Sequence, residues 1–298
     1  MSLLLDHIVI AVHDLEATIA DYAALGFNVQ RGGDHPGRST HNALVVFADG
    51  SYFELIAWKA PAPQERWWQL LQRHGEGIVD FALLPQRIAD TVAHAAQRGL
   101  VLEGPLEGGR LRPDGERLRW QTARAPSPDL PFLCGDVTPR ALRVPGGDAT
   151  VHPNGALGVA SLVVAVHDID ATLARYRALF GDGQEKGHND GRAHVGRAVA
   201  LPGGGLRLAV ISIGDSDVVL AAARDPIGGP SSPLAQRIAA RGAGPYALVL
   251  RTADAAQTSG ALDATRTHGA LIEFELVEAK PPVNSATAAS ALGARTLP

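Results

Sequence analysis

The chain repeats itself, and this duplication constrains its fold more than any other feature. Residues 7–25 (HIVIAVHDLEATIADYAAL) return as residues 161–179 (SLVVAVHDIDATLARYRAL) after a shift of 154 positions. From His13 to Leu25, eight of thirteen residues are identical in the two copies. Such self-similarity is typical of repeated structural units. We therefore expect two related halves, 1–148 and 149–298, joined in a turn-rich stretch.

Each half divides once more. Residues 77–100 and 244–271 repeat the layout of residues 4–27, which is an apolar run, a polar break, an amphipathic helix and a glycine. The sequence thus predicts four related units, at 3–60, 77–140, 157–215 and 244–298.

The periodicity of the first unit predicts its secondary structure. An Ile- and Val-rich run at 5–12 indicates a strand, and Asp14 is placed to cap a helix that Gly26 ends. Two further strands, 40–49 and 51–58, meet at Asp49-Gly50, a hairpin signal. The unit is read as βαβββ. Paired units can close their sheets into eight-stranded, cup-shaped half-barrels flanked by helices, an α+β fold.

Composition excludes several classes of protein. The net charge of -4 is spread along the 298 residues without a basic stripe, so a nucleic-acid partner is not expected. A single cysteine, Cys134, excludes an intrachain disulfide. No apolar run reaches the roughly 18 residues of a membrane span, and the start does not have the pattern of a signal peptide. We expect a cytoplasmic protein with a small-molecule partner, and a homodimer is left open.

Five motifs carry a resemblance to a known family. They are LDHIVIAVHDL (5–15), HPGRSTHNAL (35–44), YFELIAW (52–58), RPDGERLRW (112–120) and HPNGALG (152–158). With the βαβββ unit, they resemble the vicinal-oxygen-chelate superfamily and, within it, its bacterial glyoxalase-like branch. The superfamily includes lactoylglutathione lyases, extradiol dioxygenases, epimerases and drug-binding resistance proteins. Fold alone does not select among these functions.

The resemblance implies a metal site on the cup floor, built from the first and last strands of each unit. It places ligands at His7 and Glu54 in the first unit and sets Asp80 at the position that His7 holds. The fourth position falls on an apolar residue near Phe132 or Leu133. Imidazole with carboxylate suits Zn, Mn, Ni or Fe. The alternative for His7 is a buried histidine that is simply hydrogen-bonded.

Further residues are candidate substrate contacts. His41 and Asn42 begin a strand after a polar loop that contains Arg38, and Arg112 and Trp120 flank a predicted turn. Arg112 could offer a bidentate fork to a carboxylate or phosphate, although the Pro113-Asp114-Gly115 turn alone could explain that motif. Asp80 completes the candidate substrate-binding set: Arg38, His41, Asn42, Asp80, Arg112 and Trp120.

The duplication argues that the first half carries the site. The gapless shift places Ser161, Val195 and Leu208 at the positions of His7, His41 and Glu54, and Ala247 lies opposite Asp80. The scaffold pattern persists while the polar groups are lost. The second half is therefore expected to be structural.

Three functions fit these observations. The first is a metal-dependent isomerase or lyase acting on vicinal oxygens, with Glu54 as ligand or catalytic base. An extradiol-type dioxygenase is a variant of it, since His7, His41 and Glu54 have the composition of an iron triad. The second is a metal-free protein that sequesters a small molecule. The third is a cofactor-less enzyme whose base, Glu54, has a raised pKa.

Overall fold

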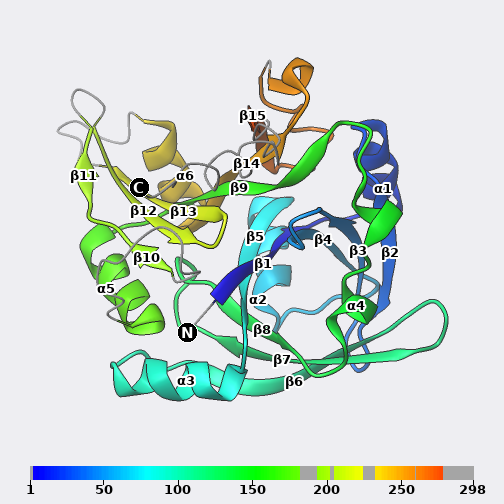
Figure 1. The fold of residues 1–298 in the computed structure, drawn as a ribbon, viewed down its shortest axis with the longest axis horizontal. Helices are drawn as coiled ribbons and strands as arrows, with labels where there is room; N and C mark the ends of the chain where they lie inside the picture. Colours follow the sequence, from blue (N-terminus) through cyan, green and yellow to red (C-terminus); the bar gives the residue numbers. More distant parts are fainter. Residues whose placement is uncertain (1–2, 182–192, 202–204, 224–231, 259, 278–298) are drawn as a thin grey trace, which may run out of the picture.

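The computed structural model describes residues 3–181, 193–201, 205–223, 232–258 and 260–277. The first half folds into a closed barrel with strand order β1-β4-β3-β2-β6-β7-β8-β5 (Figure 1). Its first unit contains β1 (Leu3–Ala11), α1 (Leu15–Ala24), β2 (Val29–Asp34), β3 (Thr40–Val46) and β4 (Tyr52–Trp58). After α2 (Arg66–His74), the second unit contains β5 (Gly77–Pro85), α3 (Ile88–Gln97), β6 (Glu103–Leu111), β7 (Arg117–Arg124) and β8 (Phe132–Asp136). The predicted α+β fold of paired βαβββ units is confirmed.

The second half forms an open sheet with order β10-β12-β13-β9-β14-β15, and β11 pairs with β12. A short helix α4 (Arg140–Arg143) and a turn η1 (Gly147–Thr150) precede it. Its elements are β9 (Ala156–Ala165), α5 (Ile169–Phe180), β10 (His194–Val195), β11 (Val199–Ala200), β12 (Leu206–Ile213), β13 (Ser216–Ala223), α6 (Pro233–Arg241), β14 (Gly244–Thr252), η2 (Ala255–Thr258) and β15 (Leu271–Leu276).

The fourth predicted unit is the least complete. Of the range 244–298, the described residues supply β14 and β15, and the part from 278 onward lies outside them. Within the described ranges, no helix combines the length and apolar character needed to cross a bilayer.

The strand register corrects the alignment of the two halves. Glu54 pairs with Val9 on β1, and the matching partner of Val163 on β9 is Val219. The shift has therefore grown from 154 to 165 by the fourth strand, and Leu208 occupies the position of Asn42. The gapless shift fails there because the second copy is longer between its helix and its last two strands. With the corrected alignment, the residue at the position of Glu54 is Val219, which is also apolar.

Two duplicated helix residues join the halves reciprocally. Tyr22 of α1 donates its hydroxyl to the carbonyl of Thr267 in the fourth unit at 3.1 Å. Its copy, Tyr176 of α5, donates to the carbonyl of Asp129 in the second unit at 3.2 Å. Both tyrosines are fully buried. Each half thus supplies a helix that packs against the other half, which explains why this helix pattern is repeated.

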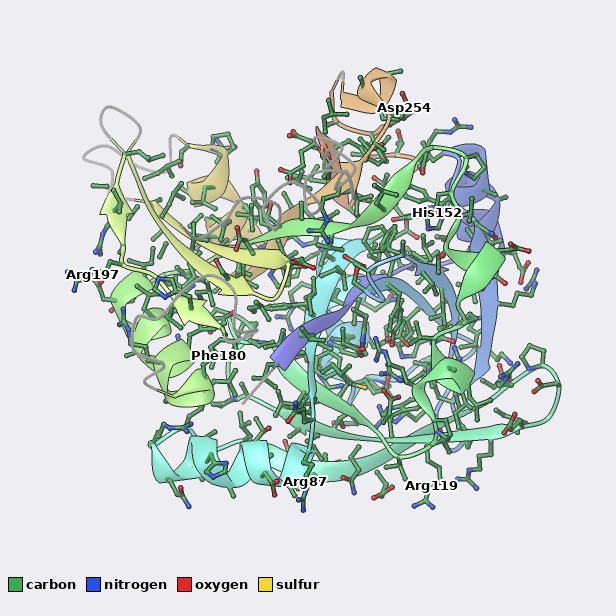
Figure 2. All side chains as sticks on the ribbon, viewed as in Figure 1. Arg87, Arg119, His152, Phe180, Arg197 and Asp254 are labelled. Carbon is green, nitrogen blue, oxygen red and sulfur yellow. The ribbon has the colours of Figure 1, made fainter. Side chains whose placement is uncertain are left out.

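The connecting segment is also bound to the barrel. The His152 side chain, labelled in Figure 2, accepts from the Asn28 amide at 2.9 Å and lies 2.9 Å from the Val46 carbonyl. The Asn154 amide group donates to the carbonyl of Leu25 at 3.0 Å. The HPNG motif is therefore a buried contact between the connecting segment and the barrel, rather than an exposed turn.

A β-bulge in β1 brings two polar residues to the same region. Leu5 pairs with Leu83 and His7 with Ala82, so Asp6 has no partner in the ladder. In an unbroken strand, Asp6 and His7 would point to opposite faces. The bulge instead lets His7 line the barrel interior while Leu5 and Ile8 both join the outer core.

Asp6 anchors α4 across the end of the barrel. Arg143 donates to Asp6 Oδ2 at 2.9 Å and Arg140 to Oδ1 at 2.5 Å. Arg143 also binds Asp136 and the Tyr52 hydroxyl, each at 2.5 Å. Burial alone would raise the pKa of Asp6, but Arg143, His7 and Arg140 outweigh it and hold the pKa far below its usual value.

Gly26 should tolerate alanine less well than Gly50 does. Both have a φ near +80°, so Ala costs about 1–2 kcal/mol of backbone strain at either position. A Cβ at Gly26 would also lie 2.9 Å from Asn154 Cβ, whereas one at Gly50 would meet nothing within 4 Å. We expect Gly26→Ala to lower the urea-unfolding midpoint clearly more than Gly50→Ala. Equal midpoints would contradict the expected steric clash with Asn154.

Asp6→Asn should destabilise the protein by about 3–5 kcal/mol at neutral pH, because it leaves buried guanidinium groups under-compensated. A carboxylate with a lowered pKa confers stability above its unfolded value, 3.8, and loses it as the pH falls. The deficit of the variant should therefore stay constant from pH 7 to about pH 5 and shrink as the pH falls below 3.8 in urea titrations. Asp170→Asn, which breaks an exposed pair with Arg207, is the control and should change little. A deficit that does not depend on pH would contradict this account.

Candidate functional site

The barrel encloses a cavity of about 510 Å³. Its polar floor is contributed by β1, β3, β4 and β6, and three aromatic rings, Trp67, Trp120 and Phe132, line other parts of it. A cavity of this size accommodates a small organic molecule.

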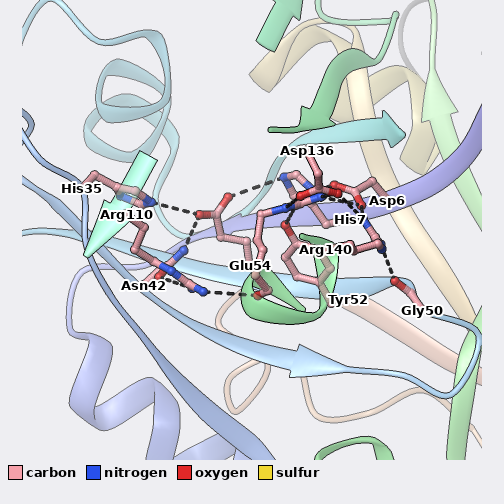
Figure 3. A network of polar contacts seen from close by, with 11 residues as sticks. Asp6, His7, His35, Asn42, Gly50, Tyr52, Glu54, Arg110, Asp136 and Arg140 are labelled. Carbon is pink, nitrogen blue, oxygen red and sulfur yellow. Dashed lines mark hydrogen bonds and ion pairs between the residues drawn. The ribbon is translucent and has the colours of Figure 1, made fainter. Parts of the chain in front are cut away.

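Glu54 lies at the centre of the floor, between two imidazoles (Figure 3). The Asn42 amide donates to Glu54 Oε1 at 2.6 Å. His7 Nε2 lies 3.6 Å from Oε2, and His35 Nε2 lies 3.7 Å from Oε1. Burial alone would raise the pKa of Glu54, but His7, His35, Asn42 and Arg110 outweigh it and lower the pKa. The carboxylate is therefore ionised at neutral pH, and the raised pKa expected for a cofactor-less base is not found.

His7 is held in one orientation. Its Nδ1 lies 2.7 Å from Asp6 Oδ2, and because an ionised carboxylate only accepts, Nδ1 carries the hydrogen. In the neutral form of the ring, the free electron pair is therefore on Nε2, the atom that faces Glu54. The ring stacks on Tyr52 at 4.7 Å between centroids and meets the edge of Phe132 at 5.3 Å.

The cavity brings together five of the predicted site residues. His7, Arg38, Asn42, Glu54 and Trp120 all line it. They come from both units of the barrel, so closure of the sheet is what assembles them.

Three predicted residues lie elsewhere. His41 alternates with Thr40 and Asn42 on β3 and faces away from the cavity. There, burial and the charge of Lys59 lower the pKa of its imidazole, an effect that Asp34 only partly offsets. Arg112 pairs with Asp114 at 2.9 Å, as the simple turn interpretation requires. Asp80 lies outside the cavity lining, where it accepts from Trp67 Nε1 at 2.9 Å and lies 3.6 Å from Arg124.

Sequence reasoning missed His35, Arg110, Arg124 and Arg143, which also line the cavity. His35 stands in a Gly- and Pro-containing loop, and its Nδ1 lies 2.8 Å from Thr40 Oγ1. Burial lowers the pKa of His35, which favours the neutral ring. The HPG motif offered a signal for His35, whereas an arginine near a strand end has none that distinguishes it from a surface residue.

The donor set does not complete the four-ligand metal centre that the resemblance implies. His7 and Glu54 offer two donors on the floor, but Asp80 is committed to Trp67 and arginine, and Phe132 is apolar. His35 lies on the other side of the Glu54 carboxylate from His7 (Figure 3). Among the described residues, no three His, Cys, Asp or Glu side chains are grouped to hold an ion. Burial raises the pKa of Cys134 to about 12, so its thiol stays protonated.

Comparisons with solved structures agree on the fold. A hypothetical protein from Staphylococcus aureus matches with a TM-score of 0.65 at 13% identity, over 92% of this chain and 100% of that one. A mutant of 4-hydroxymandelate synthase from Streptomyces coelicolor matches with a TM-score of 0.55 at 15% identity, over 85% and 72% of the two chains. A xylose isomerase-like TIM barrel/4-hydroxyphenylpyruvate dioxygenase fusion protein matches with a TM-score of 0.53 at 15% identity, over 84% of this chain and 37% of that one.

A search of curated protein sequences gave no match. The family model described as a glyoxalase-like domain matches residues 5–180, which include all of the barrel except its first two residues, and every residue of its cavity. The matched segment is more than half of the chain. The chain therefore belongs to the glyoxalase-like domain family, the branch that its motifs predicted.

Proposed function

We propose that the barrel cavity is the active site of an isomerase or lyase that moves a proton beside a carbonyl group of a small molecule with vicinal oxygens. Glu54 is the base. The observation that carries this proposal is an ionised, buried carboxylate set between two imidazoles on the floor of a cavity of substrate size. The lowered pKa makes this carboxylate a weaker base than the sequence led us to expect, but it keeps the group ionised, and an ionised carboxylate can take a proton from a carbon acid held above it.

The residues around Glu54 would divide the remaining tasks. Asn42 orients the carboxylate through Oε1, which leaves Oε2 toward His7. His7 Nε2 can accept the proton in turn, since Asp6 fixes the hydrogen on Nδ1. His35 can donate to a substrate oxygen if its Nδ1 accepts from Thr40.

A metal-dependent form of this chemistry is the second candidate. It is favoured by one observation: His7 Nε2 and Glu54 Oε2 face each other at 3.6 Å without a hydrogen bond, and Asp6 supports His7 from behind. Supporting carboxylates of this kind are common behind metal-bound histidines. A divalent ion there would polarise the vicinal oxygens. The dioxygenase variant loses its predicted triad because His41 faces away from the cavity.

Glu54→Gln should lower proton exchange by about 10²–10⁴-fold, the usual contribution of a general base. The measurement is deuterium incorporation from D₂O beside the carbonyl of α-oxo and α-hydroxy compounds, followed by NMR. Glu103→Gln, an exposed residue on β6, is the control and should exchange like the parent. Because the pKa of Glu54 is lowered, the rate should fall only below pH 4.5. Full exchange by Glu54→Gln would refute the assignment.

The metal content separates the two candidates. In the proposed form, exchange survives chelation, and elemental analysis finds no stoichiometric ion. Activity lost to a chelator and restored by Zn²⁺, Mn²⁺, Ni²⁺ or Fe²⁺ would favour the second candidate, provided that His7→Ala and Glu54→Gln both lose the ion. Ligand binding without exchange would instead indicate the sequestering function.

A further inference from the structure

The cavity carries an excess of positive charge that proton transfer does not explain. Six arginines line it, Arg38, Arg110, Arg117, Arg119, Arg124 and Arg143, against three glutamates, Glu54, Glu65 and Glu107. Arg143 is neutralised by Asp6 and Asp136, and Arg119 lies 3.5 Å from Glu107. Of the carboxylates that line the cavity, only Glu54 and Glu65 remain to balance the charges of the other four arginines.

Arg110 is a buried cation without an ionic partner in the described part of the chain. It is 4% exposed, and its guanidinium donates to the Asn42 amide oxygen and the Arg143 carbonyl, both neutral and both at 3.2 Å. Its Nε is buried without a hydrogen-bond partner, and among the described residues no carboxylate lies within 4.0 Å of it. A buried charge normally has an ionic partner, so this one lacks an anion.

Glycines keep the space around Arg110 and Trp120 open. A Cβ at Gly32 would lie 2.5 Å from Arg110 Nη1 and 1.9 Å from Asn42 Oδ1. A Cβ at Gly108 would lie 2.4 Å from Trp120 Nε1. Any larger residue at these positions would therefore displace the groups that shape this side of the cavity.

Arg124 provides a second cation beside an apolar surface. Its guanidinium carbon lies 4.6 Å from the centre of the Trp67 ring and 4.9 Å from that of Phe132. Asp80, at 3.6 Å, reaches it only loosely and is shared with Arg66. Stacking of this kind fixes the plane of the guanidinium and leaves its N–H edge for a planar anion.

We infer that the ligand of this cavity is a small carboxylate whose charged group is bound by Arg110, with Arg124 as the second cation and its apolar part against Phe132 and Trp120. The inference rests on the proposed function only in placing this ligand above Glu54. It narrows the substrate class to carbonyl compounds that also carry a carboxylate. Planar, bidentate recognition of a carboxylate is the geometry to which arginine is suited.

The test compares carboxylates with their neutral amides by isothermal titration calorimetry at pH 7 and fixed ionic strength. The probes are 2-oxobutanoate, benzoate and naphthalene-2-carboxylate, each beside its amide. At least one carboxylate should bind tenfold or more tightly than its amide. Arg110→Gln should remove this preference, and Arg110→Lys should keep part of it. Arg87→Gln, an exposed change at the N-cap of α3 (Figure 2), removes the same charge and should bind like the parent.

Arg124→Gln provides a second variant at a more exposed side chain in case Arg110→Gln does not fold, and it should weaken the preferred carboxylate several-fold. The inference is overturned if no carboxylate is preferred over its amide, or if folded Arg110→Gln and Arg124→Gln both keep the preference. Glu54→Gln should still bind the carboxylate. Binding without deuterium exchange would thus reject the proposed function alone, and exchange confined to neutral carbonyls would reject this inference alone.

Discussion

The buried carboxylate of Asp6 is the interaction on which the barrel and its cavity both depend. Because β1 bulges at this residue, Asp6 can reach the end of the barrel while the next residue, His7, faces the interior. One side chain then fixes the His7 hydrogen, neutralises Arg140 and Arg143, and holds α4 in place. Removal of the bulge would turn His7 toward the outer core, and neither the floor nor the α4 contact would form.

Much of the fold could be predicted because it is recorded locally. The duplicated run predicted two halves, and Asp14 and its copy Asp168 do cap helices, each accepting from two backbone amides. Glu54 stood out because a lone acid in an apolar strand is rare and needs a reason. These inferences depend on periodicity and on single residues out of place, which a sequence displays directly.

The rest of the site depends on contacts that sequence distance hides. Arg110 meets Asn42 across 68 residues, and Arg143 meets Asp6 across 137. His41 could not be excluded without knowing which residues of β3 face inward, since the neighbouring Asn42 has similar polarity and the opposite orientation. The gapless shift failed for a related reason: an insertion changes the register of later strands without changing their apolar pattern.

The two halves keep different parts of the common pattern, and energetics explains the division. Tyr22 and Tyr176 are both retained because each half closes against the other, so neither contact is dispensable. A polar floor has no such structural use. Burying Glu54 and Arg110 costs stability unless each finds a partner, and in the second half the place of Glu54 is taken by the apolar Val219. A floor that remains polar, with Arg110 still short of an ionic partner, is one that selection for stability alone would have made apolar. The free-energy cost of burying these polar groups is therefore found only in the half that contains the cavity.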